Sequence, residues 1–208
     1  GTCGAVCMPS RAMIMSGRNP FHLEELGGNI PESHKTLAET FKNNGYDISY
    51  HYGCYRDIDR YDNFLKVNDI GNIFVPKQEN IDEDIYNMMR ENHRWGLDDK
   101  DLFDIVINDR KSSDNDKPFV DIIMTLSTHE PFVILEGQEK YEQKAKEIFE
   151  KSNVVDTKER NNIEKNMNVF ACYLYMDECV KNLINSYKEI GRYDNTIFVI
   201  TGDHRMGM

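Results

Sequence analysis

Apolar and polar residues follow one another along this chain in blocks that predict helices and strands in turn. The stretch 33–44 repeats apolar residues at helical spacing and stops at Gly45, which predicts a short helix capped by Ser33 or Thr36. Residues 46–52 then alternate between apolar and polar, as a strand with one buried face does. A helix that leads through a glycine turn into a strand is typical of α/β folds.

The remaining segments continue this order. Amphipathic spacing predicts helices that open at 95–99 and that cover 139–151 and 158–190. Apolar runs predict strands at 71–75, 118–126 and 196–200. The last two runs are nearly continuous, which is typical of parallel strands covered on both faces. We therefore expect one domain over residues 1–208, an α/β/α sandwich with a mostly parallel central sheet.

Composition narrows the class of protein. The chain has 208 residues, of which 39% are hydrophobic and 29% charged, as in folded globular domains. Its formal net charge of −11 argues against nucleic acid as a partner, because nucleic-acid domains need clustered Lys and Arg. No apolar run is long enough for a membrane span. Cys172 and Cys179 are too far apart on their predicted helix for a disulfide, so we expect buried thiols.

The most specific pattern in the chain is C-x-P-S-R-x-x-x-x-[ST]-G at residues 7–17. Its proline suits the first turn of a helix, so Cys7 is expected just before a helix start, where free amides and the helix dipole favour an anion. Arg11 follows one turn later and can hold an oxyanion or a reactive aldehyde. Residues 12–15 are expected to form the buried face of this helix, and Gly17 to end it.

These residues resemble the sulfatase signature of the alkaline phosphatase superfamily. In that family a maturation enzyme oxidises the signature cysteine to formylglycine, whose hydrate attacks the sulfur of a sulfate ester with one hydroxyl and expels sulfate with the other. The resemblance implies that Cys7 is the formylglycine precursor and a metal ligand, and that Arg11 steadies it. It also implies a formylglycine-generating enzyme as a partner and a small-molecule or glycan sulfate ester as the substrate.

Polar residues follow two of the predicted strands. His129 lies in the loop after the strand at 118–126, and Asp203 and His204 follow the strand at 196–200. The carboxyl ends of parallel strands meet at one edge of a sheet, where α/β folds bind their ligands. A carboxylate beside an imidazole suits a divalent metal ion. The sequence therefore predicts a metal site formed by Asp203, His204 and position 7.

Further stretches resemble the catalytic domains of lipoteichoic-acid synthases and related phosphoglycerol transferases, which share the alkaline phosphatase fold. They are residues 36–46, 95–103, 117–132 and 193–206. This resemblance implies that His129 contacts the substrate and that Asp203 and His204 bind metal. It also maps a phosphate-binding His and Arg onto His51 and Arg60. The nucleophile of these transferases is a Thr in a different motif, so position 7 favours a sulfatase.

The leading interpretation is a sulfatase in which Cys7, Arg11 and His129 are catalytic, with His129 donating a proton to the leaving oxygen or positioning it. A phosphoglycerol transferase or phosphodiesterase on the same scaffold, and a catalytically incomplete remnant domain, are the alternatives. The resemblance implies Ca²⁺ for a sulfatase, Mn²⁺ or Mg²⁺ for a transferase, and a periplasmic or cell-surface location. We also expect the chain to be an internal segment of a longer protein, with an alkaline phosphatase-like fold that is incomplete at both ends.

Overall fold

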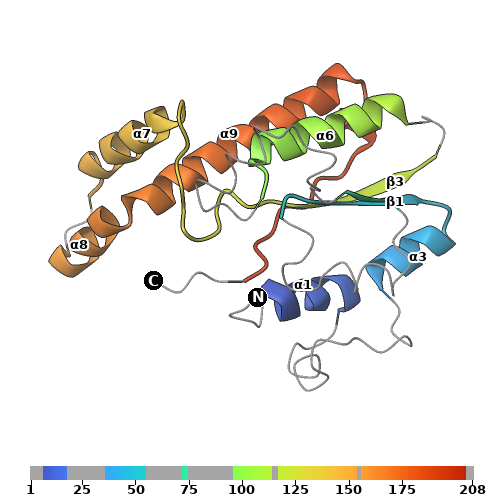
Figure 1. Cartoon of the computed structure of the whole chain (residues 1–208), viewed down its shortest axis with the longest axis horizontal. Helices are drawn as coiled ribbons and strands as arrows, with labels where there is room; N and C mark the ends of the chain where they lie inside the picture. The colour runs from blue at the N-terminus through green and yellow to red at the C-terminus, as the bar shows by residue number, and fades with distance from the viewer. Residues whose placement is uncertain are drawn as a thin grey trace. The chain divides into compact units, whose positions relative to one another are not determined.

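The computed structural model describes residues 7–17, 36–54, 72–74, 96–113, 117–153 and 156–204 (Figure 1). The chain forms two compact units. The first unit comprises Gly1–Val75, Ser113–Met124 and Asn195–Met208, and the second comprises Pro76–Ser112 and Thr125–Asp194. The single domain expected over 1–208 stays a prediction.

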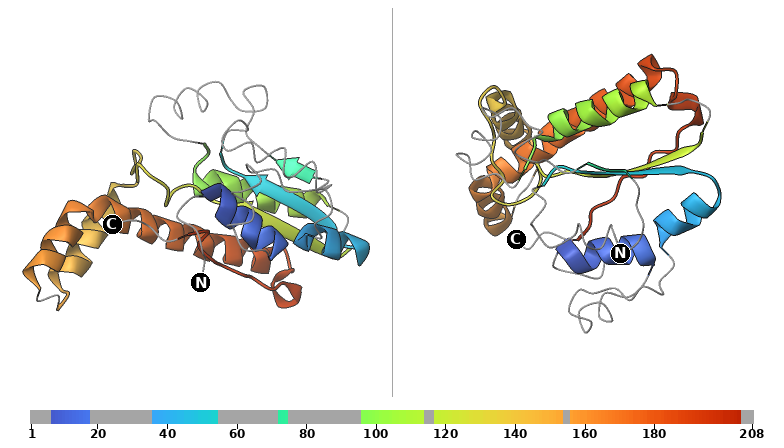
Figure 2. Two further views of the ribbon diagram at one scale, coloured as in Figure 1. Left: turned by 90° about the horizontal axis from the view of Figure 1, so that it is seen from below. Right: turned by 45° about the vertical axis from the view of Figure 1, so that its right-hand side comes forward.

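A parallel sheet lies at the centre of the first unit. Its described strands are β1 (Asp47–Tyr52), β2 (Asn72–Phe74) and β3 (Phe119–Met124), in the order β2-β1-β3. Both neighbours of β1 run parallel to it, and Figure 2 shows the short β2 arrow beside β1. The predicted strands at 46–52, 71–75 and 118–126 are therefore confirmed, and so is the parallel direction of the sheet.

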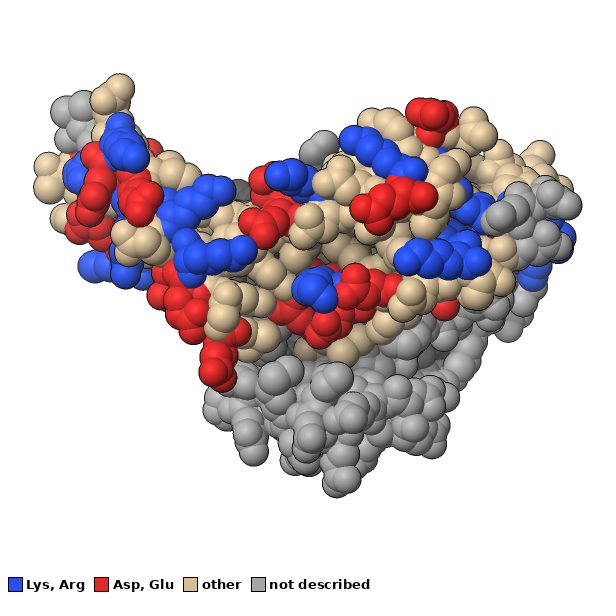
Figure 3. Space-filling view, turned by 90° about the horizontal axis from the view of Figure 1, so that it is seen from above, with Lys and Arg blue, Asp and Glu red and all other residues tan. Residues whose placement is uncertain are grey.

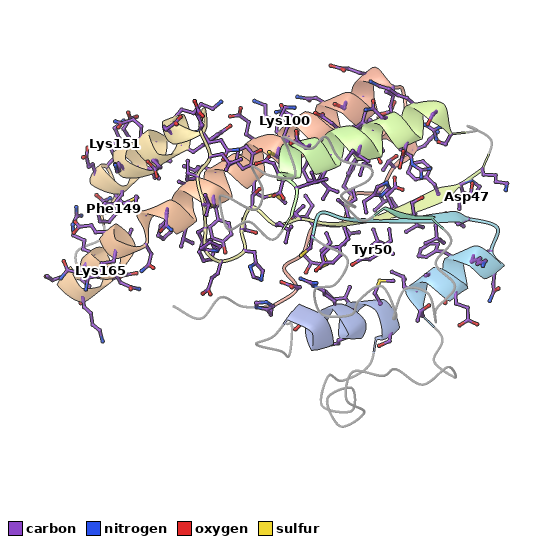
Figure 4. The ribbon with its side chains drawn as sticks, viewed as in Figure 1. Asp47, Tyr50, Lys100, Phe149, Lys151 and Lys165 are labelled. Carbon is purple, nitrogen blue, oxygen red and sulfur yellow. The ribbon has the colours of Figure 1, made fainter. Side chains whose placement is uncertain are left out.

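Burial along the two longer strands differs from the predicted pattern. The alternation at 46–52 predicted one buried face, yet every residue of β1 after Asp47 is buried. Parallel sheets are usually covered on both faces, and α3 packs against β1. β3 was expected to be covered on both faces but is half-buried along its whole length, as an outer strand of the described sheet. Tyr50 of β1 reaches β3, with its hydroxyl 3.2 Å from the Met124 sulfur (Figure 4).

The apolar run at 196–200 is not the buried strand that its composition predicts. It has neither helical nor strand structure, and the side chains of Ile197, Val199 and Ile200 are 90%, 83% and 67% exposed. β-branched residues favour a strand where neighbouring chain packs against them. The described residues leave these three side chains largely uncovered, so the prediction of a second buried strand is wrong here.

Helix α1 (Cys7–Ser16) carries the C-x-P-S-R motif. It begins at Cys7 itself, whereas the sequence predicted that Cys7 would precede the helix. It ends at Gly17 as predicted, where φ is +68°, a conformation that glycine adopts without strain. Ile14 was expected on the buried face but is 40% exposed, and the buried positions include Arg11. The helix therefore buries a cation of the motif and exposes one of its apolar residues.

Helix α3 (Leu37–Asn43) packs against β1. Thr36 is its N-cap, because its hydroxyl oxygen accepts a hydrogen bond from the Glu39 amide at 3.1 Å. Thr36 is 2% exposed, so water cannot readily replace this bond. Of the two predicted caps, Thr36 is confirmed, and Ser33 lies outside the described residues.

Replacing Thr36 with Ala should lower the free energy of unfolding by about 1 kcal/mol, because the first turn of α3 loses the acceptor for the Glu39 amide. Thr40→Ala is the matched control, since Thr40 is exposed and its hydroxyl donates to the Thr36 carbonyl within the helix. Alanine favours helices, so the control should lose little or no stability. Urea unfolding followed by circular dichroism measures both variants, and equal losses would contradict the cap.

The longer regular elements described for the second unit are helices. Its helices are α6 (Asp99–Ser112), α7 (Glu139–Glu150), α8 (Thr157–Lys165) and α9 (Met167–Glu189), followed by a short 3-10 helix, η3 (Tyr193–Asn195). α6 and α7 each pack against α9 (Figure 1). The predicted helices opening at 95–99 and covering 139–151 are confirmed. None of the described helices is both long and apolar enough to cross a membrane.

The long helix predicted over 158–190 is divided in two at Asn166. This residue has φ −114° and ψ 28°, outside helical geometry, and its side-chain amide donates to the Asn162 carbonyl at 2.8 Å. A short polar side chain that binds the preceding turn competes with the helical backbone, which explains the break. Gly191 ends α9 as predicted, with φ +71°.

The interface of α7 and α9 forms one part of the described core of the second unit. Tyr141, Ala145 and Phe149 are buried along one face of α7, and the Tyr141 and Tyr175 rings meet edge to face with centroids 5.3 Å apart. Cys172 and Cys179 of α9 are buried thiols, as predicted. The pKa of Cys179 is raised to about 12, mainly by burial.

On the face shown in Figure 3, Lys and Arg are interspersed with Asp and Glu, so no basic patch gathers there.

Candidate functional site

Arg11 is held inside the first unit by Tyr52. Its side chain is 5% exposed, and its Nη1 donates to the Tyr52 hydroxyl at 2.8 Å. The guanidinium carbon also lies 5.2 Å from the Tyr52 ring centroid, a cation–π distance. Burial is the main cause that raises the pKa of Tyr52 above its ordinary value, so the phenol stays neutral. Because Tyr52 is the last residue of β1, the contact fixes α1 against the carboxyl end of this strand.

Asp203 lies beside the same guanidinium. Arg11 Nε is 3.6 Å from Asp203 Oδ2, and the Asp203 side chain is 27% exposed. The other carboxylate oxygen accepts from the His204 amide at 2.9 Å, and His204 Nε2 is 3.7 Å from Asp203 Oδ2. The structure thus brings the motif helix and the Asp203-His204 loop together, at the carboxyl end of β1. The run before this loop is not the predicted strand, yet the loop still reaches the predicted place.

Asp203 and His204 fit a divalent metal ion in chemical type, since a carboxylate oxygen and an imidazole nitrogen are common ligands. They supply only two donors, and the described residues contain no cluster of three or more His, Cys, Asp or Glu side chains. The Cys7 side chain lies outside the described part of the structure. The shared metal site of Asp203, His204 and position 7 therefore stays a prediction.

The predicted substrate-binding pair is described only in part. His51 lies within β1 between Tyr50 and Tyr52, and it is 1% exposed. In this structure its imidazole is therefore shielded from solvent. Arg60 lies outside the described residues, so the pairing of the two side chains stays a prediction.

His129 belongs to the second unit, in the loop that follows β3. Its amide donates to the Leu126 carbonyl at 2.9 Å, which closes a turn, and its Nδ1 lies 2.7 Å from the Glu130 carbonyl oxygen. A carbonyl oxygen only accepts, so Nδ1 carries the proton of this contact. The half-exposed ring is therefore oriented by its own backbone.

A small pocket that His129 helps to line lies within the second unit. Gly96 and Leu97 line one side, and residues between 126 and 133 line the other. Its walls are mostly apolar, and Ser127 and His129 supply polar groups.

Sequence reasoning missed Asp98 and Asp99, which connect the two sides of this pocket. Asp99 is 0% exposed, and its Oδ1 accepts from the amides of Leu126 and Ser127 at 2.7 and 3.1 Å. Burial is the main cause that raises the pKa of Asp99 to about 6. The available signal was two adjacent carboxylates directly after an apolar Trp-Gly-Leu segment. In the sequence such a pair is indistinguishable from an ordinary helix start, where acidic residues are favoured.

Comparison with known proteins places the chain in a family. The sulfatase family model matches residues 1–208. The lipoteichoic acid synthase-like protein YvgJ of Bacillus subtilis is 31% identical over 110 residues, which are 53% of this chain and 15% of that protein. Lipoteichoic acid synthase 1 of Bacillus subtilis is 30% identical over 125 residues, which are 60% of this chain and 17% of that protein. The chain thus spans less than a fifth of the length of these relatives.

A solved structure supports the fold. The sulfatase-type protein yidJ of Bacteroides fragilis superposes with a TM-score of 0.57 at 17% sequence identity, over 91% of this chain and 50% of that one. This likeness confirms the predicted α/β class with an alkaline phosphatase-like fold. Since the sulfatase family model covers the whole chain, the chain belongs to the sulfatase family.

Proposed function

We propose that this chain is the nucleophile-bearing part of an enzyme that hydrolyses sulfate esters. The observation that carries the proposal is the 3.6 Å contact of Arg11 with Asp203, because it joins the C-x-P-S-R helix to the Asp203-His204 loop. A small-molecule or glycan sulfate ester is the proposed substrate, and a formylglycine-generating enzyme is the proposed maturation partner. A periplasmic or cell-surface location is part of the same proposal.

In this proposal Arg11 provides a fixed positive charge beside position 7. Tyr52 holds the guanidinium through a hydrogen bond and its ring face, so the charge is oriented before a substrate arrives. A preoriented cation in a buried setting stabilises an anion more strongly than one in water. Arg11 therefore offsets negative charge at the start of α1.

Asp203 and His204, together with position 7, would hold the divalent ion, Ca²⁺ for a sulfatase. When bound, such an ion acts as a Lewis acid on an ester oxygen. The contact with Arg11 restrains Asp203, and the His204 amide fixes its other oxygen. These bonds orient the carboxylate independently of the ion, as the outer-shell partners of metal ligands do.

His129 is the proposed proton donor to the leaving oxygen, or the residue that positions it. Replacing His129 with Ala in the full-length enzyme should lower kcat/KM for an aryl sulfate by about tenfold or more, because the proton transfer is lost. The melting temperature should change little, since the ring is half-exposed and its bond to Glu130 is local. Steady-state kinetics and calorimetry measure the two effects. A large loss of stability with unchanged turnover per folded molecule would contradict this role.

A phosphoglycerol transferase or phosphodiesterase is the second candidate, because the curated relatives at about 30% identity are lipoteichoic acid synthases. Mn²⁺ or Mg²⁺ would then replace Ca²⁺ as the proposed ion. A parallel assay of the full-length protein on an aryl sulfate and a bis-aryl phosphodiester, with each ion in turn, separates the two candidates. Turnover of the phosphodiester alone would favour the second, and turnover of neither would favour an inactive remnant.

A further inference from the structure

The loop that carries His129 is attached at both ends to the start of α6. At its beginning, Asp99 Oδ1 accepts from the amides of Leu126 and Ser127 at 2.7 and 3.1 Å. The Ser127 hydroxyl oxygen in turn accepts from the Asp99 amide at 3.4 Å. Ser127 is 5% exposed, so its bonds with Asp99 are buried, whereas the bond from the Leu126 amide is partly buried. The attachment is two residues from His129.

Asp98 makes the second attachment, at the end of the loop. Its Oδ2 accepts from the Gln138 side-chain amide at 3.0 Å, and Gln138 Oε1 accepts from the Leu135 amide at 3.1 Å. The Tyr175 hydroxyl of α9 donates to Asp98 Oδ1, which also accepts from the Lys100 amide at 3.0 Å. Asp98 is thus held by α6 and α9 while it holds the last turn of the loop.

Stability alone does not explain a carboxylate in the position of Asp99. It is fully buried, and its Oδ2 has no hydrogen-bond partner among the described residues. A buried charge with an unsatisfied oxygen destabilises the folded state relative to a neutral group of similar shape. Buried ionisable side chains with an unsatisfied oxygen are concentrated at functional sites.

We propose that Asp98 and Asp99 are positioning residues that clamp the two ends of the loop 125–138 and so fix His129 and the adjoining pocket wall for the substrate. The role in turnover rests on the proposed function, whereas the clamp itself does not. Gly96 and Leu97 directly precede the clamp and line one side of the pocket, and residues from 126 to 133 line the other. The carboxylates therefore set the distance between the two sides.

Hydrogen exchange of the full-length protein tests the clamp. In Asp99→Ala the peptide containing residues 125–133 should exchange about tenfold faster or more, because two amides lose a charged acceptor. Asp99→Asn keeps an acceptor oxygen at the same place and should restore most of the protection. Asp101→Ala is the matched control, since Asp101 lies on the same helix with a side chain that is 45% exposed. Equal exchange in Asp99→Ala and Asp101→Ala would overturn the proposal.

A measurement on the wild type keeps the proposal testable if Asp99→Ala fails to fold. Amide NMR signals of Leu126 and Ser127 should move as Asp99 takes up a proton, and this movement should be absent in Asp99→Asn. Signals that move identically in both proteins would overturn the clamp, because another group would then cause the shift.

Kinetics separate the clamp from the proposed function. Asp99→Ala should lower kcat for the preferred ester by about tenfold, with partial recovery in Asp99→Asn, because His129 is no longer held in place. If wild type turns over neither sulfate esters nor phosphodiesters, the proposed function fails while exchange and NMR still decide the clamp. If the loop loosens in Asp99→Ala and kcat stays unchanged, the positioning role is wrong although the contacts exist.

Discussion

Replacing Cys7 with Ala should abolish sulfate ester hydrolysis by the full-length protein. A thiol with a pKa of about 8.5 is mostly protonated at pH 7, and a thiolate has no second hydroxyl with which to expel sulfate. Formylglycine at position 7 supplies both hydroxyls once hydrated. We therefore expect an aldehyde at position 7, by peptide mass spectrometry, in protein made with a formylglycine-generating enzyme. The same protein should cleave an aryl sulfate.

The controls for this experiment come from the same chain. Cys179→Ala removes a buried thiol whose raised pKa leaves it protonated, so its turnover per folded molecule should equal that of wild type. Protein made without the maturation enzyme should retain the thiol and lack sulfatase activity. An unmodified thiol in the maturing host, with turnover of phosphodiesters and no sulfate ester, would replace the sulfatase proposal with the transferase proposal.

Local pattern was sufficient to predict most of the regular structure. The glycine stops at Gly17 and Gly191 and the cap at Thr36 are short-range effects, and each is confirmed. The break at Asn166 was missed because the apolar spacing continues through it, while the competing side-chain bond to Asn162 depends on the rotamer. The run 196–200 was mispredicted because burial depends on what covers a segment.

Some features of the candidate site could also be predicted from the sequence, and others could not. The nearness of Arg11 to the Asp203-His204 loop was predictable, because the motif and the topology of parallel sheets both place ligand-binding residues at one edge. The buried role of Asp99 was not, because it arises from the packing of the loop after β3 against the start of α6. In the sequence Asp99 is typical of the first turn of a helix. In the folded unit its carboxylate also accepts a hydrogen bond from the amide of Leu126, 27 positions later in the chain.

The stability of the second unit should depend on pH through Asp99. Burial raises its pKa from 3.8 to about 6, so between these values the folded chain holds a proton that the unfolded chain has released. Among the described residues, the titratable groups that interact with Asp99 include Asp98 at the start of α6 and Cys179 on α9, and Lys100 follows Asp99 directly in α6. Because the folded state binds more protons, the contribution of Asp99 is fully present below the lower value and is lost as pH rises through the upper one.

The free energy of unfolding of wild type relative to Asp99→Asn should therefore fall by about 2 kcal/mol between pH 4 and pH 7, since each pKa unit corresponds to about 1.4 kcal/mol and part of the effect lies below pH 4. The variant cannot ionise, so the comparison cancels the pH dependence of every other group that the two proteins share. Urea unfolding at several pH values measures the difference, and Asp101→Asn serves as the exposed control with a nearly constant difference. A relative stability of wild type that stays constant or rises with pH would mean that Asp99 is not a buried carboxylate held at the start of α6. A salt-bridged carboxylate would make the relative stability of wild type rise with pH, whereas Asp99 should make it fall. The direction of the change therefore distinguishes a carboxylate that positions the loop from one that stabilises the fold.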